Sequence, residues 1–483
     1  MYNWSVIFLI RAVDTHSKEA GEMINEILLC KKSPDVGILF CLNTKIEYIK
    51  KLLPKRFGRS RRPNDEQTTV FLSMNDSRIS EAEARLDFIL EDKNFDIREE
   101  VDVKKVFKEK VLPAFRAVKY LLFTWDHGSV FGIFKDPPPD SLRLKSVQDE
   151  SIIDTKTNRD SPFMPIEFLI SKFIDFDKAN KEQSARKILR EIRKRYLHSL
   201  NLVEEFDENG TPGFDMLTAY ELNEAIKWAF GIRKQGEGGI DVVCMMNCCM
   251  QFFDTGFALR ETVNYLVAPE TVMLFSGYNY SVIFEELFKD SKMNEMELSY
   301  IIVDSFKYKK FADRTHGERA IEETALFGND LTFYSEAALE INELAKNLRN
   351  KITKPLELGI IRETRGQCTV MPSTSEYTII DFFTYLELLF KNGSSGISPF
   401  YNKFAKELIP KITGKRFHIG NRLDINGDGK FIRPRSFSVF YAKNKNELID
   451  FYREFIDELS ENSTEFSQRF QWDNFVKEYL YRI

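Results

Sequence analysis

A series of continuous apolar runs, separated by segments of helical periodicity, constrains the fold of this chain most strongly. Such runs predict strands at residues 4–13, 36–42, 68–74 and 118–124. Apolar residues at helical spacing predict helices at residues 17–30 and 101–115. Strands that are apolar along their whole length and alternate with helices are typical of a mainly parallel sheet covered on both faces. The sequence therefore predicts an α/β fold.

A long insertion interrupts this pattern between about residues 135 and 214. It opens with Asp-Pro-Pro-Pro-Asp at 136–140, continues as a polar run to Ser161 and includes a very basic stretch around residues 184–196, predicted to be a helix. Proline-rich and charged composition is typical of an exposed, cleavable loop.

The sheet pattern then resumes, and it changes again beyond about residue 310. Strands are expected at 240–246 and 265–268 and helices at 217–232 and 251–263; the later part has helices at 336–351, 377–390 and 446–459 and a strand at 437–441. We therefore predict a first domain at 1–313, including the insertion, and a mixed α+β domain at 314–483. A chain of 483 residues is long enough for this division.

Charge and hydropathy restrict the partners of the protein. With 69 basic and 74 acidic residues, the net charge of −5 argues against general binding to nucleic acid or anionic lipid. The basic stretches 55–62 and 185–195 would suit an acidic partner or nucleic acid, but the second, with its helical spacing, is interpreted as a solvated face. The first residues are interpreted as a strand rather than a signal peptide, and no apolar run approaches the roughly 20 residues that span a bilayer. We expect a cytoplasmic protein with reduced thiols.

Three of the six cysteines lie together in DVVCMMNCCM, residues 241–250. A structural zinc site usually needs two spaced ligand pairs, and only one group is present, so no metal is expected here. A bridge between the adjacent Cys248 and Cys249 would be strained. Two interpretations remain: packing in the core, which suits Cys244 in its apolar strand, or a nucleophile.

Position favours Cys248 as the nucleophile. It falls where the strand at 240–246 ends and the helix at 251–263 is predicted to begin, and sites in parallel α/β sheets lie beyond the carboxyl ends of strands. A helix N-terminus would also favour the thiolate. His127 follows the strand at 118–124 in the same way and is the candidate base; His316 is weaker, because no strand precedes it.

These motifs resemble the clostripain family of cysteine peptidases, which has a caspase-type fold. The likeness lies in WDHGS after one strand and D-V-V-x-x-x-N-C-C-M-x-x-x-D after another. The family's second motif typically runs Asp, two aliphatic residues, Gly, aromatic, Asp, small residue, Cys, Leu, Met, with a later acidic residue in the helix. Asp241, Cys248 and Asp254 match its first residue, its nucleophile and that acidic residue. The resemblance implies a caspase-like α/β/α sandwich and spans nearly the whole chain.

The resemblance also implies a mechanism. Cys248 would attack the scissile carbonyl, and His127 would protonate the leaving amine. Backbone N–H groups of Gly128 and Cys248 would stabilise the oxyanion, with protein or peptide as the substrate and no cofactor. Asp126, Tyr278 and Asn279 are expected to contact the substrate, together with Met246.

The substrate pocket departs from the family's pattern. Relatives usually cut after Arg or Lys and place an Asp two residues before the nucleophile, where this chain has Met246. Asn279 stands where relatives often carry an acidic residue. Loss of these carboxylates predicts a less basic pocket, or an acidic group supplied from elsewhere in the chain.

Two further features of the sequence bear on regulation. Relatives often mature by cleavage between the histidine and the cysteine, and the loop at 135–161 suits such cleavage; the alternative is a solvated loop that is not processed. Asp424, Asn426 and Asp428 resemble the first half of a calcium loop, but Arg435 stands at the twelfth position, where an EF-hand needs Glu. Calcium is therefore a weak candidate ligand.

A rival from another class is a catalytically silent regulatory or scaffold protein on the same fold, which would bind a protein or polyanion partner. A nucleotide-binding protein is disfavoured, because no glycine-rich loop follows a predicted strand.

Overall fold

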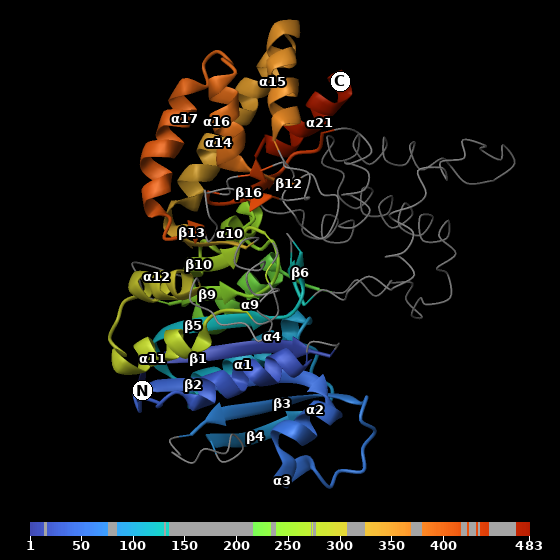
Figure 1. The fold of residues 1–483 in the computed structure, drawn as a ribbon, viewed down its shortest axis with the longest axis vertical. Helices are drawn as coiled ribbons and strands as arrows, with labels where there is room; N and C mark the ends of the chain where they lie inside the picture. Colours follow the sequence, from blue (N-terminus) through green and yellow to red (C-terminus); the bar gives the residue numbers. More distant parts are fainter. Residues whose placement is uncertain are drawn as a thin grey trace, which may run out of the picture.

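A nine-stranded sheet organises the molecule (Figure 1), with the strand order β13-β11-β10-β9-β5-β1-β2-β3-β4. The computed structural model describes all residues except 14–16, 76–84, 130–131, 135–215, 233–237, 272, 274–276, 307–323, 369–378, 417–422, 425–430, 433–434 and 444–469. The central strands run parallel, and this confirms the predicted mainly parallel α/β sheet.

The five parallel strands are apolar along nearly their whole length, as expected for strands covered on both faces. They are β1 (Tyr2–Ala12), β2 (Val36–Lys45), β5 (Ala117–Trp125), β9 (Ile240–Met245) and β10 (Val263–Pro269). The antiparallel edges are β3 (Gln67–Met74) with β4 (Leu86–Asp92) on one side, and β11 (Ala325–Asp330) with β13 (Lys415–Arg416) on the other.

Helices cover the sheet in two layers. One layer holds α1 (Ser17–Leu29), α2 (Ile46–Leu52), α11 (Tyr280–Lys289) and α12 (Glu295–Ser305), which contact one another in series. The other holds α4 (Glu100–Lys105), the π-helix η2 (Val106–Val111), α9 (Ala219–Phe230) and α10 (Phe253–Leu259). The short helices α3 (Pro54–Phe57) and α5 (Leu112–Ala114) and three short strands, β6 (Gly128–Ser129), β7 (Gly132–Ile133) and β8 (Leu217–Thr218), complete this part.

The C-terminal part forms a helical layer beyond the β11 edge of the sheet (Figure 1). Its helices are η5 (Leu331–Phe333), α14 (Tyr334–Lys351), α15 (Pro355–Gln367), α16 (Phe382–Lys391), α17 (Ser398–Lys403), η6 (Phe404–Leu408), η7 (Ile409–Lys411) and α21 (Trp472–Arg482). Two short antiparallel strand pairs accompany them: β12 (Ile379–Asp381) pairs with β16 (Ser438–Phe440), and β14 (Leu423–Asp424) pairs with β15 (Phe431–Ile432). Strands β11 and β13 lie beyond residue 314 yet pair into the main sheet. The division at 313 and 314 stays a prediction.

Aromatic side chains join this layer to the peptide that follows Cys248. Phe253 at the start of α10 stacks on Tyr334, with ring centroids 5.0 Å apart, and lies 4.9 Å from Phe437. The Ser438 N–H donates to the Gln251 carbonyl at 3.0 Å. Phe253, Tyr334 and Phe437 thus pack together at the junction between the sheet and the C-terminal helices.

Some predicted helices differ from the observed ones. The helix expected at 251–263 is the shorter α10, because Val263 already belongs to β10. The helix expected at 377–390 begins with strand β12, and Asp381 then caps α16 by accepting from the Thr384 N–H. The helix at 101–115 is divided by η2, just before Pro113, whose ring cannot donate a backbone hydrogen bond. The helices predicted at 184–196 and 446–459 lie outside the described residues.

Candidate active site

The ends of two neighbouring parallel strands define the site. β5 and β9 are paired, and Thr124 of β5 stands opposite Met245 of β9. The N–H of the next residue, Met246, donates to the Thr124 carbonyl at 3.0 Å. Both strands therefore end at the same edge of the sheet. His127 and Cys248 follow these strand ends within three residues.

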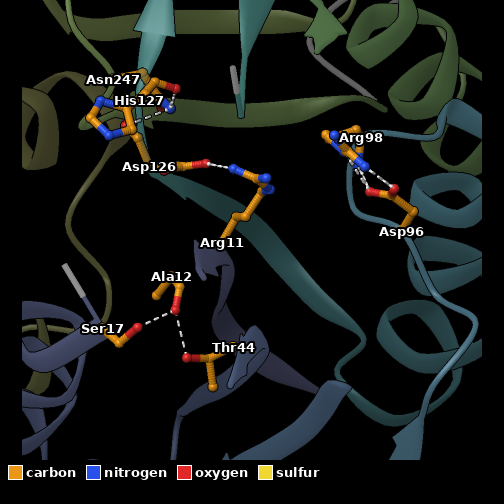
Figure 2. Close-up of polar contacts among 9 residues, drawn as sticks. All are labelled: Arg11, Ala12, Ser17, Thr44, Asp96, Arg98, Asp126, His127 and Asn247. Carbon is orange, nitrogen blue, oxygen red and sulfur yellow. Dashed lines mark hydrogen bonds and ion pairs between the residues drawn. The ribbon is translucent and has the colours of Figure 1, made fainter. Parts of the chain in front are cut away.

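The side chain of Asn247 connects these two chain segments. Its Oδ1 accepts from the Thr124 hydroxyl at 2.5 Å, and its Nδ2 donates to the carbonyls of Asp126 at 3.1 Å and His127 at 3.0 Å. Figure 2 shows Asn247 beside His127, above Asp126. Asn247 is fully buried. The residue directly before Cys248 thus holds the backbone of the candidate base.

Gly128 is packed directly against the segment that carries Cys248. A Cβ placed on Gly128 would lie 2.4 Å from the Asn247 Cβ and 3.1 Å from the Cys248 nitrogen. No side chain fits at the first of these distances, so a residue without a side chain is required. The predicted oxyanion donors, the N–H groups of Gly128 and Cys248, therefore belong to backbone segments in contact.

The Cys248 thiol is buried in this conformation. The residue is 9% exposed, the Met273 N–H donates to Sγ at 3.4 Å, and the Sγ–H faces the Met273 carbonyl at 3.6 Å. Burial raises the pKa of the Cys248 thiol, although the hydrogen bonds from the Met273 and Cys248 backbone oppose this effect. The expectation that a helix N-terminus lowers this pKa is wrong, because α10 begins only at Phe253 and Cys248 lies in a turn before it.

A buried ion pair lies below His127. The Arg11 Nη1 is 2.9 Å from the Asp126 Oδ2, and both side chains are buried (Figure 2). Burial raises the pKa of Asp126 to about 7, and the nearby Arg11 and His127 act in the opposite direction. Asp126, expected to contact substrate, instead directs its carboxylate towards Arg11 at the end of β1.

The other two cysteines of the cluster are also buried. Cys244 lies within β9. Cys249 has a positive φ of 58°, and its N–H donates to the Thr271 carbonyl at 3.0 Å. All six cysteines are free thiols. Within the described part of the chain, no group of three or more Cys, His, Asp or Glu side chains could hold a metal ion.

The residues predicted to contact the substrate are buried and make contacts inside the protein. Met246 is buried, and its Cγ would lie 3.0 Å from a Cβ on Gly277. The Tyr278 hydroxyl donates to the Met245 carbonyl at 2.6 Å, and the Asn279 Nδ2 donates to the Ser305 carbonyl at 3.1 Å. Both side chains are buried and use these groups inside the protein.

Several predicted features lie outside the described residues. His316 and the loop at 135–161 are among them, as are Asn426 and Asp428 of the candidate calcium loop. For Asp424 only the backbone is described, in β14. Among the described helices, none is both long enough and apolar enough to cross a bilayer.

Three residues of the site were missed by the sequence analysis: Asn247, Arg11 and Met273. Asn247 had a signal, because it stands at a position where the resembled motif has a small residue. Arg11 had a weaker one, as a charge that interrupts an apolar strand. Met273 had none, since its contact with Cys248 is made through the backbone.

Comparison with known proteins identifies the family. A model of the clostripain family matches residues 203–479, which include Cys248 but not His127. No curated protein sequence matches the chain. The fold is similar to a secreted C11 cysteine protease from Bacteroides thetaiotaomicron in complex with an irreversible peptide inhibitor, at 14% identity and a TM-score of 0.52, covering 95% of this chain and 99% of that one.

A second structure with a similar fold is an inactive zymogen C11 protease from Parabacteroides distasonis. It has 12% identity and a TM-score of 0.52, and 98% of each chain is covered. These likenesses agree with the predicted caspase-like sandwich. The family match covers more than half of the sequence. The chain therefore belongs to the clostripain family of cysteine peptidases.

Proposed function

We propose that the protein is an endopeptidase that hydrolyses peptide bonds with Cys248 as the nucleophile and His127 as the acid and base. The observation that carries the proposal is the hydrogen bond from the Asn247 side chain to the His127 carbonyl at 3.0 Å. It joins the backbone of the candidate base to the residue before the candidate nucleophile. A cysteine and a histidine from two adjacent strand ends are the groups that covalent acyl transfer requires.

The proposed reaction has two stages. Cys248 Sγ forms a bond to the scissile carbonyl carbon, the carbon–nitrogen bond breaks, and the proton from the thiol passes through His127 to the leaving amine. Water then attacks the thioester, His127 accepts its proton, and the thiol is restored as the carboxylic acid leaves. The N–H groups of Gly128 and Cys248 stabilise the oxyanion in both stages.

The burial of Cys248 supports a latent form of this enzyme. Its sulfur contacts the Met273 backbone, and a substrate carbonyl must replace this contact before attack. We propose that cleavage in the loop at 135–161 accompanies maturation. The Parabacteroides distasonis structure of similar fold is itself described as an inactive zymogen.

The same observation favours a second candidate, the silent regulatory or scaffold protein. A thiol that stays buried and protonated would not attack a peptide. The two candidates differ in one measurable property: the scaffold would show no cleavage even after the loop is cut.

A peptide-library cleavage profile tests the proposal. The wild type is assayed before and after limited proteolysis of the loop, beside Cys248→Ala, Cys249→Ala and His127→Ala. We expect cleavage by the wild type and by Cys249→Ala, none by Cys248→Ala, and a loss of roughly 100- to 10,000-fold in His127→Ala. Loss of cleavage only in Cys249→Ala would refute the assignment, and an inactive wild type would favour the scaffold.

The same profile measures specificity. We propose a preference that is less basic than is usual in the family, because Met246 and Asn279 supply no carboxylate. A strong preference for cleavage after Arg or Lys would contradict this, and would require an acidic group from another part of the chain.

A further inference from the structure

We propose that Asn247 is a positioning residue of the peptidase reaction: its amide fixes the orientation of the His127–Gly128 peptide and thereby the direction of the Gly128 N–H. The inference rests on the proposed function, since it concerns the oxyanion donor of that reaction. It goes further by assigning a role to a residue whose side chain acts through the backbone of Asp126 and His127.

The hydrogen bonds of Asn247 leave only one way to place its amide group. Thr124 offers a hydroxyl at 2.5 Å, whereas Asp126 and His127 offer carbonyl oxygens at 3.1 and 3.0 Å. Only the NH₂ group can donate to two carbonyls, so the oxygen must face the hydroxyl. Both N–H bonds of the amide are therefore used on the backbone of the segment that carries the candidate base.

These contacts determine the direction of the next peptide. The His127 carbonyl accepts from the Asn247 Nδ2 and from the Phe134 N–H, each at 3.0 Å. In a trans peptide the N–H points opposite to the C=O, so the Gly128 N–H points away from both donors.

The small ladder formed by β6 and β7 leads to the same conclusion. Gly128 stands opposite Ile133, and the hydrogen bond beside this pair runs from the Phe134 N–H to the His127 carbonyl. This pattern makes Gly128 and Ile133 a non-hydrogen-bonded pair, in which the N–H of Gly128 points out of the ladder. The N–H is thus held in a fixed direction without being used by β7.

The close packing of Gly128 adds a second restraint. A Cβ on Gly128 would lie 2.4 Å from the Asn247 Cβ, so only glycine fits at position 128 against this segment. A small residue at position 247, as in the resembled family motif, cannot reach two carbonyl oxygens. The resembled motif therefore lacks the hydrogen bonds that Asn247 makes in this chain with Thr124, Asp126 and His127.

The test compares Asn247→Asp with Asn223→Asp. The first change keeps the shape of the side chain but removes both donors and places a carboxylate beside two carbonyl oxygens. Asn223 is a matched control, because it is also a buried asparagine that accepts from a threonine hydroxyl, that of Thr262, at 2.7 Å. Thr262 precedes β10, at the end of the sheet opposite the site.

Two readouts are measured on the full chain. The first is kcat and KM for a fluorogenic peptide chosen from the library profile; the second is the exchange rate of the Phe134 amide, followed by mass spectrometry. In Asn247→Asp we expect kcat to fall about 100-fold or more, as for loss of an oxyanion donor, with KM changed by less than about 3-fold. Hydrogen exchange of the Phe134 amide should accelerate by roughly 10-fold or more. Asn223→Asp should change neither.

The outcomes separate this inference from the proposed function. A wild-type kcat in Asn247→Asp would overturn the catalytic consequence, and unchanged exchange would overturn the positioning itself. If the wild type hydrolyses no peptide, the proposed function fails, whereas faster exchange in the variant still supports the orientation of this peptide by Asn247. Asn247→Ala, which brings no charge into the core, replaces the aspartate variant if the latter does not fold.

Discussion

The guanidinium of Arg11 and the carboxylate of Asp126 form an ion pair at 2.9 Å beneath the candidate site, and both side chains are buried. Arg11 lies near the end of β1, and Asp126 directly follows β5, the parallel neighbour of β1. The pair therefore ties together two strand ends at the edge of the sheet where His127 is held. Its energetics lead to the first two predictions.

Replacing Arg11 should destabilise the fold strongly. Arg11→Met keeps much of the side-chain volume but leaves the Asp126 carboxylate buried without its cation. Loss of one partner of a buried pair costs roughly 3–5 kcal/mol of unfolding free energy. Urea denaturation at pH 8 measures this, and Arg11→Met in the Asp126→Asn background is the control, since removal of both charges should restore part of the stability. A loss below about 1 kcal/mol, the range of exposed pairs, would contradict the prediction.

The stability of the wild type should depend on pH through Asp126. Its pKa of about 7 in the folded state exceeds the ordinary value of 3.8, so between these values the folded protein retains a proton that the unfolded chain has released. The contribution of this group is therefore fully present below pH 3.8 and is lost as the pH rises through about 7.

Asp126→Asn isolates this effect, because the amide does not titrate. The difference in unfolding free energy between wild type and variant should change with pH by up to about 1.4 kcal/mol per pH unit, with the wild type losing stability relative to the variant from pH 4 to 7. Urea midpoints at half-unit intervals measure it. A difference that is flat, or that changes in the opposite sense, would show that Asp126 keeps its ordinary pKa.

Gly128→Ala should be poorly tolerated for a steric reason. The added methyl group would meet the Asn247 Cβ at 2.4 Å, and overpacking of this kind costs about 1–3 kcal/mol. We also expect peptidase activity to fall, because the predicted oxyanion donor moves with the backbone. Gly359→Ala, inside α15 with nothing within 4 Å of the new Cβ, is the control and should gain about 0.5–1 kcal/mol. Equal thermal stability of the two variants would refute the close approach.

Substitution by valine should destabilise the protein more at Cys249 than at Cys244. Cys249 has a φ of 58°, where a β-branched residue is strained, whereas Cys244 lies in a strand, which suits valine. Cys249→Val should therefore be less stable than Cys244→Val by about 1–2 kcal/mol. Denaturation of both variants under identical conditions decides the matter, and equal midpoints would mean that the left-handed turn is absent in solution.

The rate at which Cys248 is alkylated should still increase with pH in the alkaline range. Burial raises the pKa of this thiol, so little thiolate forms near neutrality in the conformation described here. Iodoacetamide modification, followed by mass spectrometry of the peptide that contains Cys248, should give a midpoint above about 8.5, the ordinary value for cysteine. A lower midpoint would indicate a thiolate that is already activated, and would contradict a latent form.

The sequence by itself predicted the strands, their mainly parallel direction and the edge of the sheet where the candidate site lies. Apolar runs such as residues 118–124 can be satisfied only in a sheet covered on both faces, and the carboxyl ends of parallel strands meet at one edge. Cys248 and His127 could therefore be assigned to one region from the sequence. The resemblance to the clostripain family also assigned Gly128, after His127, as an oxyanion donor, and this assignment stays a prediction.

Only the tertiary structure decided how this region is held together. Arg11 and Asp126 are 115 residues apart in the sequence, and Asn247 and His127 are 120 apart. Such pairings depend on strand order and register, which local patterns do not specify. The pKa of Cys248 depends in the same way on tertiary packing, because burial of the thiol raises it and α10 begins too far along the chain to lower it. Periodicity located the strand ends, and long-range packing determined which side chains meet there.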